Sequence, residues 1–228
     1  MIKRISAQQA ARIDKELMGT CGFSIDQLME LAGQAVAHAL YRVHPPSKGS
    51  KVLVLVGPGN NGGDGLVASR HLSLMGYEPK VYCPKPTSGA LFDGLRTQLE
   101  VFRVPYVDTK DLPSAFSTAD IIVDALFGFS FKPPVRESFV PVMDLLSSTS
   151  KPTVAVDIPS SWDVDNGPGD SKFNPSVLVS LTAPKKCADS FKGRHFIGGR
   201  FITPAFAQKY DFDVPPYEGT QQVFEELN

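Results

Sequence analysis

The glycine-rich stretch at residues 57–65 suits a ligand site, because its glycines alternate with two asparagines and an aspartate. It follows five apolar residues, 52–56, which are typical of a strand buried on both faces of a parallel sheet. We expect a helix to begin near Gly65 and to end close to Gly76. The first N–H groups of a helix lack internal partners and carry partial positive charge, so a strand-to-helix corner of this kind is suited to phosphate.

Three of these glycines, Gly57, Gly59 and Gly62, have the G-x-G-x-x-G spacing of dinucleotide-binding sites. An enzyme that transfers hydride with bound NAD also needs an acidic residue at the end of the next strand, where it holds a ribose hydroxyl. The next strand-like run, residues 80–85, contains no acid. An NAD-dependent oxidoreductase is therefore disfavoured, whereas binding of a nucleotide-like ligand is not.

Polar side chains also end two later apolar runs, at Asp124 and Asp157. Together with Asn60, Asn61 and Asp64, they offer oxygen atoms to a hard cation, although the last three would also serve as turn residues and a helix cap. Ligands of open α/β sheets collect at the carboxyl ends of the strands, where the strand order reverses. We therefore expect three strand ends to form one site.

The chain resembles the NAD(P)H-hydrate epimerases, a family also known as the YjeF N-terminal domain and, in animals, as apolipoprotein A-I binding protein. The resemblance covers nearly the whole chain, in the order of the family's motifs. Its segments are residues 27–33, 57–72, 123–134, 157–160, 181–185 and 198–201.

This resemblance implies an isomerase that interconverts the R and S forms of hydrated NADH and NADPH (NADHX and NADPHX). These damaged cofactors carry a hydroxyl group at C6 of the reduced nicotinamide ring. A partner dehydratase acts only on the S form, and we expect it to be a separate chain because 228 residues leave no room for it. The alternative is a non-catalytic nucleotide- or protein-binding scaffold of the same fold, which would have no need for the polar residues that the chain retains.

The resemblance also implies roles for individual residues. It implies one potassium ion per subunit, held by Asn61, Asp124 and Ser160, whose hard oxygen atoms suit such an ion and could equally hold sodium or water. The residues that match the family's substrate contacts are Asn60, Asn61, Gly62, Gly63, Asp64, Gly128, Phe129, Ser130, Phe131, Lys132, Pro133, Pro134 and Asp157.

Epimerisation at C6 requires the C–O bond, or the ring, to open and re-form on the opposite face, so a side chain must carry a proton to and from oxygen. We expect Asp157 to be this general acid/base, because it matches the family's substrate-contacting acid. Lys185 is the second catalytic candidate. A surface lysine is an equally good interpretation, since Lys186 lies beside it.

One position departs from the family pattern, because Ser161 stands where the family usually has glycine. If the backbone there needs a positive φ, serine costs on the order of 1 kcal/mol. Such a cost would disturb the geometry around Ser160, and with it the expected ion site.

The composition is that of a soluble enzyme domain, with 42% hydrophobic and 21% charged residues and a formal net charge of −1. This balance excludes a strongly basic nucleic-acid-binding face, and no segment is apolar enough to span a membrane. Three widely spaced cysteines and the absence of a leader-like start predict a cytoplasmic protein, with mitochondria as the alternative. The family resemblance adds a homodimer and an apolipoprotein partner.

The order of the patterns predicts one domain, residues 1–228, with an α/β fold: a Rossmann-like three-layer αβα arrangement around a mostly parallel sheet, plus two N-terminal helices. The expected helices lie at residues 6–18, after Ser24, within 90–102 and at 139–146. The expected strands are 52–56, 80–83, the runs ending at Asp124 and Asp157, 177–181 and 200–202. The four histidines have no catalytic or metal-binding spacing and are predicted to be structural or surface residues.

Overall fold

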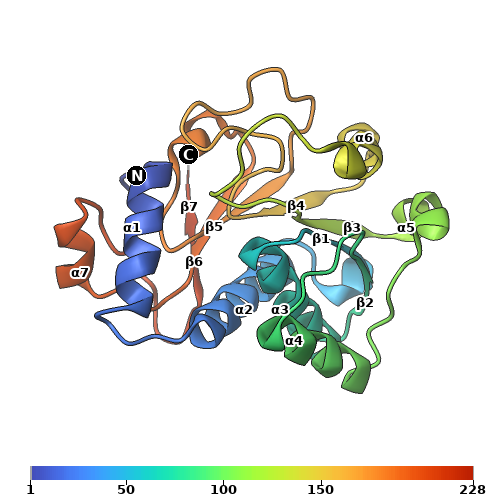
Figure 1. The fold of residues 1–228 in the computed structure, drawn as a ribbon, viewed down its shortest axis with the longest axis horizontal. Helices are drawn as coiled ribbons and strands as arrows, with labels where there is room; N and C mark the ends of the chain where they lie inside the picture. The colour runs from blue at the N-terminus through green and yellow to red at the C-terminus, as the bar shows by residue number, and fades with distance from the viewer. Residues whose placement is uncertain (1, 228) are drawn as a thin grey trace.

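The computed structural model describes residues 2–227, which form a seven-stranded sheet between layers of helices (Figure 1). In spatial order, the strands are β2 (Glu78–Tyr82), β1 (Lys51–Val56), β3 (Ile121–Ala125), β4 (Thr153–Val156), β5 (Val177–Leu181), β6 (Arg194–Gly198) and β7 (Val223–Glu226). Only β7 runs antiparallel to its neighbour among these strands. The strand order reverses between β1 and β3, so the crevice expected in an open α/β sheet lies at their carboxyl ends.

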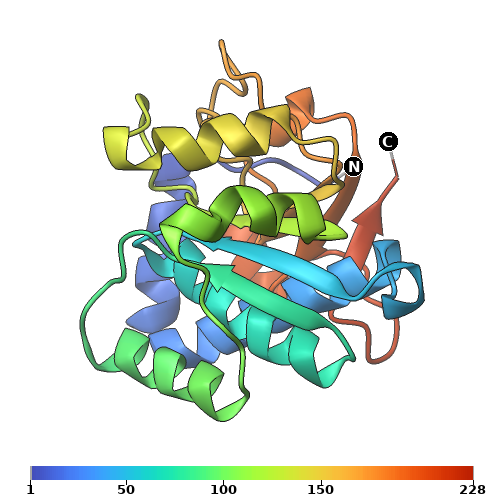
Figure 2. The same ribbon diagram turned by 90° about the vertical axis from the view of Figure 1, so that its right-hand side faces the viewer.

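Helices cover both faces of the sheet (Figure 2). One face carries α2 (Ile25–Val43), α3 (Asn60–Leu74) and α4 (Ala90–Val101), and the other carries α5 (Leu112–Thr118) and α6 (Val140–Ser148). Strand β1 shows why both faces of the sheet need a covering layer: its successive side chains point to opposite faces, and its buried side chains on each face are apolar. Val52 and Val54 join the core shared with α2, α3 and α4, whereas Leu53 and Leu55 pack with residues of α5 and α6. The predicted α/β fold is confirmed.

Two further helices, α1 (Ala7–Met18) and α7 (Pro204–Lys209), lie beside the β5–β7 end of the sheet. Capping boxes start both N-terminal helices, with Ser6 and Gln9 at α1 and Ser24 and Gln27 at α2. The two predicted N-terminal helices are therefore confirmed. Short 3₁₀ turns occupy Pro46–Lys48, Thr109–Asp111, Glu137–Phe139 and Lys186–Ser190.

Helix α3 begins at Asn60, so the predicted start near Gly65 is wrong. Its glycines are needed for close packing rather than for a loop. A Cβ atom on Gly62 would lie 2.0 Å from the carbonyl oxygen of Gly57, and one on Gly65 would lie 2.6 Å from the Ala125 side chain. The first turn of α3 can therefore sit directly against the ends of β1 and β3.

The predicted strand at residues 200–202 is also wrong, because these residues follow β6 in an irregular segment. Gly199 has a φ of 79° and turns the chain away after β6. Strands β6 and β7 and the short helices α5 and α7 were not predicted. No helix within residues 2–227 is long and apolar enough to cross a membrane.

Candidate functional site

A cavity of about 690 Å³ opens at the carboxyl ends of β1, β3, β4 and β5. Most of the predicted site residues line it, namely Asn60, Asn61, Asp64, Gly128, Phe129, Ser130, Phe131, Lys132, Pro134, Asp157 and Lys185. Gly62, Gly63 and Pro133 adjoin these residues in the chain but are not among the lining residues. The structure thus brings the three predicted strand ends to one cavity.

Asp157 and Lys185 form a buried ion pair in the wall of this cavity. Lys185 is 2% exposed, so its interpretation as a surface lysine is wrong. Its Nζ donates a hydrogen bond to Asp157 Oδ1 and another, of 2.7 Å, to the Leu181 carbonyl oxygen. Asp157 Oδ2 accepts a hydrogen bond of 3.1 Å from the Phe129 N–H. The carboxylate is therefore held in one orientation beside the cavity.

The backbone at Asp157 is also unusual, because its φ is 69°. Thr182, another lining residue, has a φ of 68°. Left-handed conformations of non-glycine residues cost free energy, and they persist where surrounding contacts impose them, often at functional sites. Two of them in one cavity wall indicate that the positions of its polar groups are tightly constrained.

Asp124 and Ser160 form a hydrogen-bonded pair of buried residues next to the cavity, where the N–H of the lining residue Phe127 donates to Ser160 Oγ. Ser160 Oγ donates to Asp124 Oδ1 over 2.6 Å, and the Ser160 N–H donates to Oδ2 over 2.8 Å. Burial raises the pKa of the Asp124 carboxyl to about 6, although these hydrogen bonds oppose the shift. A buried carboxylate of this kind would be stabilised by a nearby cation.

Asn61, the third expected ion ligand, extends toward Gly128 at the amino end of α3. Its buried Nδ2 has no hydrogen-bond partner within residues 2–227. Rotating the amide by 180° would present its oxygen there instead, and such orientations are assigned from hydrogen-bond partners. No group of three or more His, Cys, Asp or Glu side chains in the described part of the chain is placed to hold a metal ion.

Two further carboxyl groups line the cavity, those of Asp64 and Asp14. Burial raises the pKa of Asp64 well above its usual range, and the negative charges of Asp157 and Asp14 add to this shift. Burial also raises the pKa of Asp14 to about 6, and Lys185 partly offsets the effect. Asp14 was not predicted as a site residue, because on the sequence it is one of several polar residues of an amphipathic helix.

The segment after β3 forms one rim of the cavity. The rings of Phe127 and Phe131 stack with centroids 4.8 Å apart, and Phe139 contacts Phe127 edge-on. Exposed Lys132 and Arg136 lie on the same rim. Arg136 was also missed, since no pattern in the sequence links it to the strand ends.

Comparison with known proteins identifies the family of the chain that forms this cavity. A family model described as "YjeF-related protein N-terminus" matches residues 25–187. A protein of Fusarium vanettenii is 56% identical over 98% of this chain and 96% of its own length, and one of Neurospora crassa is 54% identical over the same shares. Both are named NAD(P)H-hydrate epimerase. The chain belongs to the YjeF-related family.

A solved structure supports the YjeF-related fold of the described residues. The crystal structure of the yeast protein ynu0 is 45% identical to this chain and superposes with a TM-score of 0.94, covering 98% of this chain and all of the yeast chain. The sheet and helices that surround the cavity are therefore a shared architecture.

Proposed function

We propose that this chain is an NAD(P)H-hydrate epimerase, which interconverts the R and S forms of NADHX and NADPHX at C6 of the nicotinamide ring. Relatives more than 50% identical over nearly the whole chain carry this name. The observation within the structure that carries the proposal is the buried Asp157–Lys185 pair in the wall of a cavity large enough for such a ligand.

The proposed chemistry needs a proton carrier beside the C6 hydroxyl. When the C–O bond breaks, the departing oxygen takes the electron pair and needs a proton, and the oxygen that returns on the other face must lose one. Asp157 performs this transfer, while Lys185 and the Phe129 N–H hold its carboxylate. A group fixed in place needs less reorganisation during the reaction.

The phosphate groups of the substrate have two positive regions available in this proposal. No side chain among the described residues caps the amino end of α3, so its first N–H groups can bind an anion. Lys132 and Arg136 supply positive charge on the rim after β3. Both regions line the same cavity as Asp157.

We also propose one potassium ion per subunit, held by Asn61, Asp124 and Ser160. Three features support the fit: the donors are hard oxygen atoms, Asp124 is a buried carboxyl, and the Asn61 amide has an atom without a protein partner. The ion would supply positive charge beneath the substrate. If it binds there, potassium raises the melting temperature relative to tetramethylammonium, and Asp124→Asn removes this difference.

A coupled assay tests the activity. A mixture of R and S NADHX is incubated in potassium buffer with an S-specific dehydratase, and NADH recovery is followed with and without the protein. We expect the protein to rescue the slow R fraction. Asp157→Asn should lower kcat/KM by about 10²-fold or more; asparagine is chosen because it tolerates the left-handed backbone at this position.

The control is Asp144→Asn, the same change at an exposed site on α6, which should leave the rate unchanged. Loss of R NADHX at only the spontaneous rate, with the cofactor still bound, would support the non-catalytic scaffold. An active Asp157→Asn variant would instead refute the role of Asp157 alone.

The proposal extends to partners and location. It includes a separate S-specific dehydratase that consumes the product, a homodimer, an apolipoprotein as a protein ligand, and residence in the cytoplasm or in mitochondria. Light scattering at several protein concentrations tests the homodimer directly.

A further inference from the structure

Asp14 places a third acidic side chain in the cavity from an element outside the sheet. Ala10, Asp14 and Met18 repeat every four residues along α1 and line the cavity together. On the adjoining side of the helix, Ile13 and Leu17 are buried in an apolar cluster that also includes Ala10. Asp14 is the one charged residue on the cavity-facing stripe of α1, and it is half-buried.

The carboxyl group of Asp14 lies within electrostatic range of the catalytic pair. Lys185 lowers its pKa and Asp157 raises it, after the larger effect of burial, and the resulting value is about 6. Asp14 in turn raises the pKa of Asp64. No hydrogen bond from residues 2–227 to the Asp14 carboxyl group contributes to its pKa shift. Its oxygen atoms therefore remain available to a ligand. Lys132 and Arg136 are the other charged residues that line the cavity.

The N-terminal segment positions Asp14 and Lys185 together. The N–H of Ile5 donates to the Pro184 carbonyl oxygen over 2.8 Å, and the Lys186 N–H donates to the Ile5 carbonyl oxygen over 3.2 Å, so Ile5 pairs with the backbone on both sides of Lys185. Ser6, the next residue, caps α1. The segment that supports Lys185 therefore leads directly into the helix that carries Asp14.

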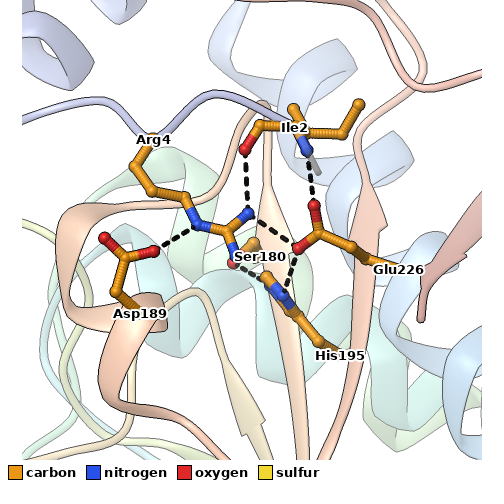
Figure 3. A network of polar contacts seen from close by, with 6 residues as sticks. All are labelled: Ile2, Arg4, Ser180, Asp189, His195 and Glu226. Carbon is orange, nitrogen blue, oxygen red and sulfur yellow. Dashed lines mark hydrogen bonds and ion pairs between the residues drawn. The ribbon is translucent and has the colours of Figure 1, made fainter. Parts of the chain in front are cut away.

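A polar network anchors this segment to the end of the chain (Figure 3). Arg4 donates hydrogen bonds to Glu226 Oε2 over 2.7 Å and to Asp189 Oδ1 over 2.9 Å. Glu226 also contacts His195 Nδ1 at 3.1 Å. Because side chains from β7 and from the 3₁₀ turn after β5 hold Arg4, the N-terminal segment that leads into α1 is anchored.

We propose that Asp14 is a second catalytic carboxyl group, which exchanges protons with the C6 oxygen on the face of the ring opposite Asp157. The inference rests on the proposed epimerase function. One carboxyl group donates a proton to the C6 hydroxyl, the C–O bond breaks with its electron pair, and water leaves while the N1 lone pair forms the N1=C6 double bond. Water then adds to the other face and gives its proton to the other carboxylate. Nothing is oxidised or reduced, and one proton moves between the two groups.

This arrangement has a defined pH dependence. The reaction needs one proton shared by the two carboxyl groups, so the rate falls when the pH is raised far enough to remove it. Since the pKa of Asp14 is about 6, kcat/KM should fall above about pH 6. The fall in kcat/KM should be equal for the R-to-S and the S-to-R conversion, because both use the enzyme form in which the two carboxyl groups share one proton.

The test compares Asp14→Asn, Asp14→Glu and the exposed control Asp144→Asn in the coupled assay from pH 5 to 8, after subtraction of the spontaneous rate at each pH. We expect Asp14→Asn to lower kcat by about 10²-fold or more, to lose the decline near pH 6, and to bind NADH within about threefold of the wild type. Asp14→Glu should recover part of the rate and the decline.

Full activity of Asp14→Asn would overturn the inference while leaving the epimerase function intact. So would a lower rate with an unchanged pH profile, which would indicate a structural role. If Asp14→Asn does not fold, as judged by circular dichroism, the wild-type and Asp14→Glu profiles decide, and the absence of a decline near pH 6 in both refutes the inference. An inactive wild type would overturn the proposed function itself.

Discussion

Single residues at this site hold conformations that their side chains alone would not favour. Asp157, Ser161 and Thr182 all have φ values near 70°, and all follow the carboxyl ends of β4 or β5. The expected strain at Ser161 is therefore present. Ser160 nevertheless keeps both hydrogen bonds to Asp124, and Ser161 Oγ lies 2.6 Å from Ser171 Oγ. The contact between the Ser161 and Ser171 hydroxyl groups helps to offset the cost of the backbone conformation at Ser161.

Two substitutions at Ser161 separate these effects. Ser161→Ala loses the hydrogen bond and keeps the strain, so it should destabilise the protein by about 1 kcal/mol. Ser161→Gly loses the same bond but relieves the left-handed strain, and should therefore be about 1 kcal/mol more stable than the alanine variant. Urea unfolding measures both. Equal stability of the two variants would show that the positive φ carries no cost.

Without the family resemblance, the sequence predicts a site residue only where that residue adjoins a recognisable strand end. Asp124 and Asp157 met this condition because each closes an apolar run. The burial of Lys185 could not be predicted, since it depends on Ile5, which lies far away in the chain and pairs with the adjacent backbone. The same holds for Asp14, whose contact with the cavity follows from the placement of α1.

At the scale of elements, the contact between α2 and α3 positions the amino end of α3 in the cavity. Gly33 of α2 allows the two helices to approach closely. A Cβ atom there would lie 2.5 Å from Val67 Cβ and 2.7 Å from the carbonyl oxygen of Asp64. Any larger residue at this position must push α3, and with it the lining residues of its first turn.

Gly33→Ala should therefore destabilise the protein by about 1–3 kcal/mol, the usual cost of overpacking, and should also raise KM through the shift of α3. Gly94→Ala is the matched control, because Gly94 lies inside α4 with open space around its Cβ position. It should instead stabilise the protein by about 0.5–1 kcal/mol, from helix propensity. Thermal melts and steady-state kinetics distinguish the two. A Gly33→Ala variant as stable as Gly94→Ala would contradict the packing argument.

Among the strands, those that the sequence predicted well are buried along their length. Strands β1, β3, β4 and β5 are buried on both faces and have continuous apolar runs. Strands β6 and β7 contain His195 and Glu226, which are buried because they pair with each other. Their apolar pattern is interrupted for that reason, and only the tertiary structure makes these polar residues compatible with a sheet.

At the scale of the whole molecule, this polar pair joins the two ends of the chain. Glu226 of β7 accepts hydrogen bonds from Arg4 and from the Ile2 N–H, and His195 Nε2 lies 2.9 Å from Ser180 Oγ (Figure 3). The antiparallel edge strand and the N-terminal segment thus depend on one network. Since that segment also supports Lys185 and α1, the stability of the network is linked to the geometry of the cavity.

The network should make stability depend on pH. Burial, and next the charge of Arg4, lower the pKa of His195 from 6.5 to about 4, although Glu226 opposes the shift. Between these values the unfolded chain binds a proton that the folded chain does not, so the free energy of unfolding falls as the pH drops from 6.5 to 4, by about 3 kcal/mol in total.

His195→Gln keeps a hydrogen-bonding side chain but cannot titrate in this range. Its free energy of unfolding, measured with urea at intervals from pH 7.5 to 4, should differ from the wild-type value by a constant amount above pH 6.5. Below that pH, the wild type should lose stability faster than the variant. Parallel curves over the whole range would show that the pKa of His195 is the same in the folded and the unfolded protein, and would contradict the neutral buried imidazole below pH 6.5.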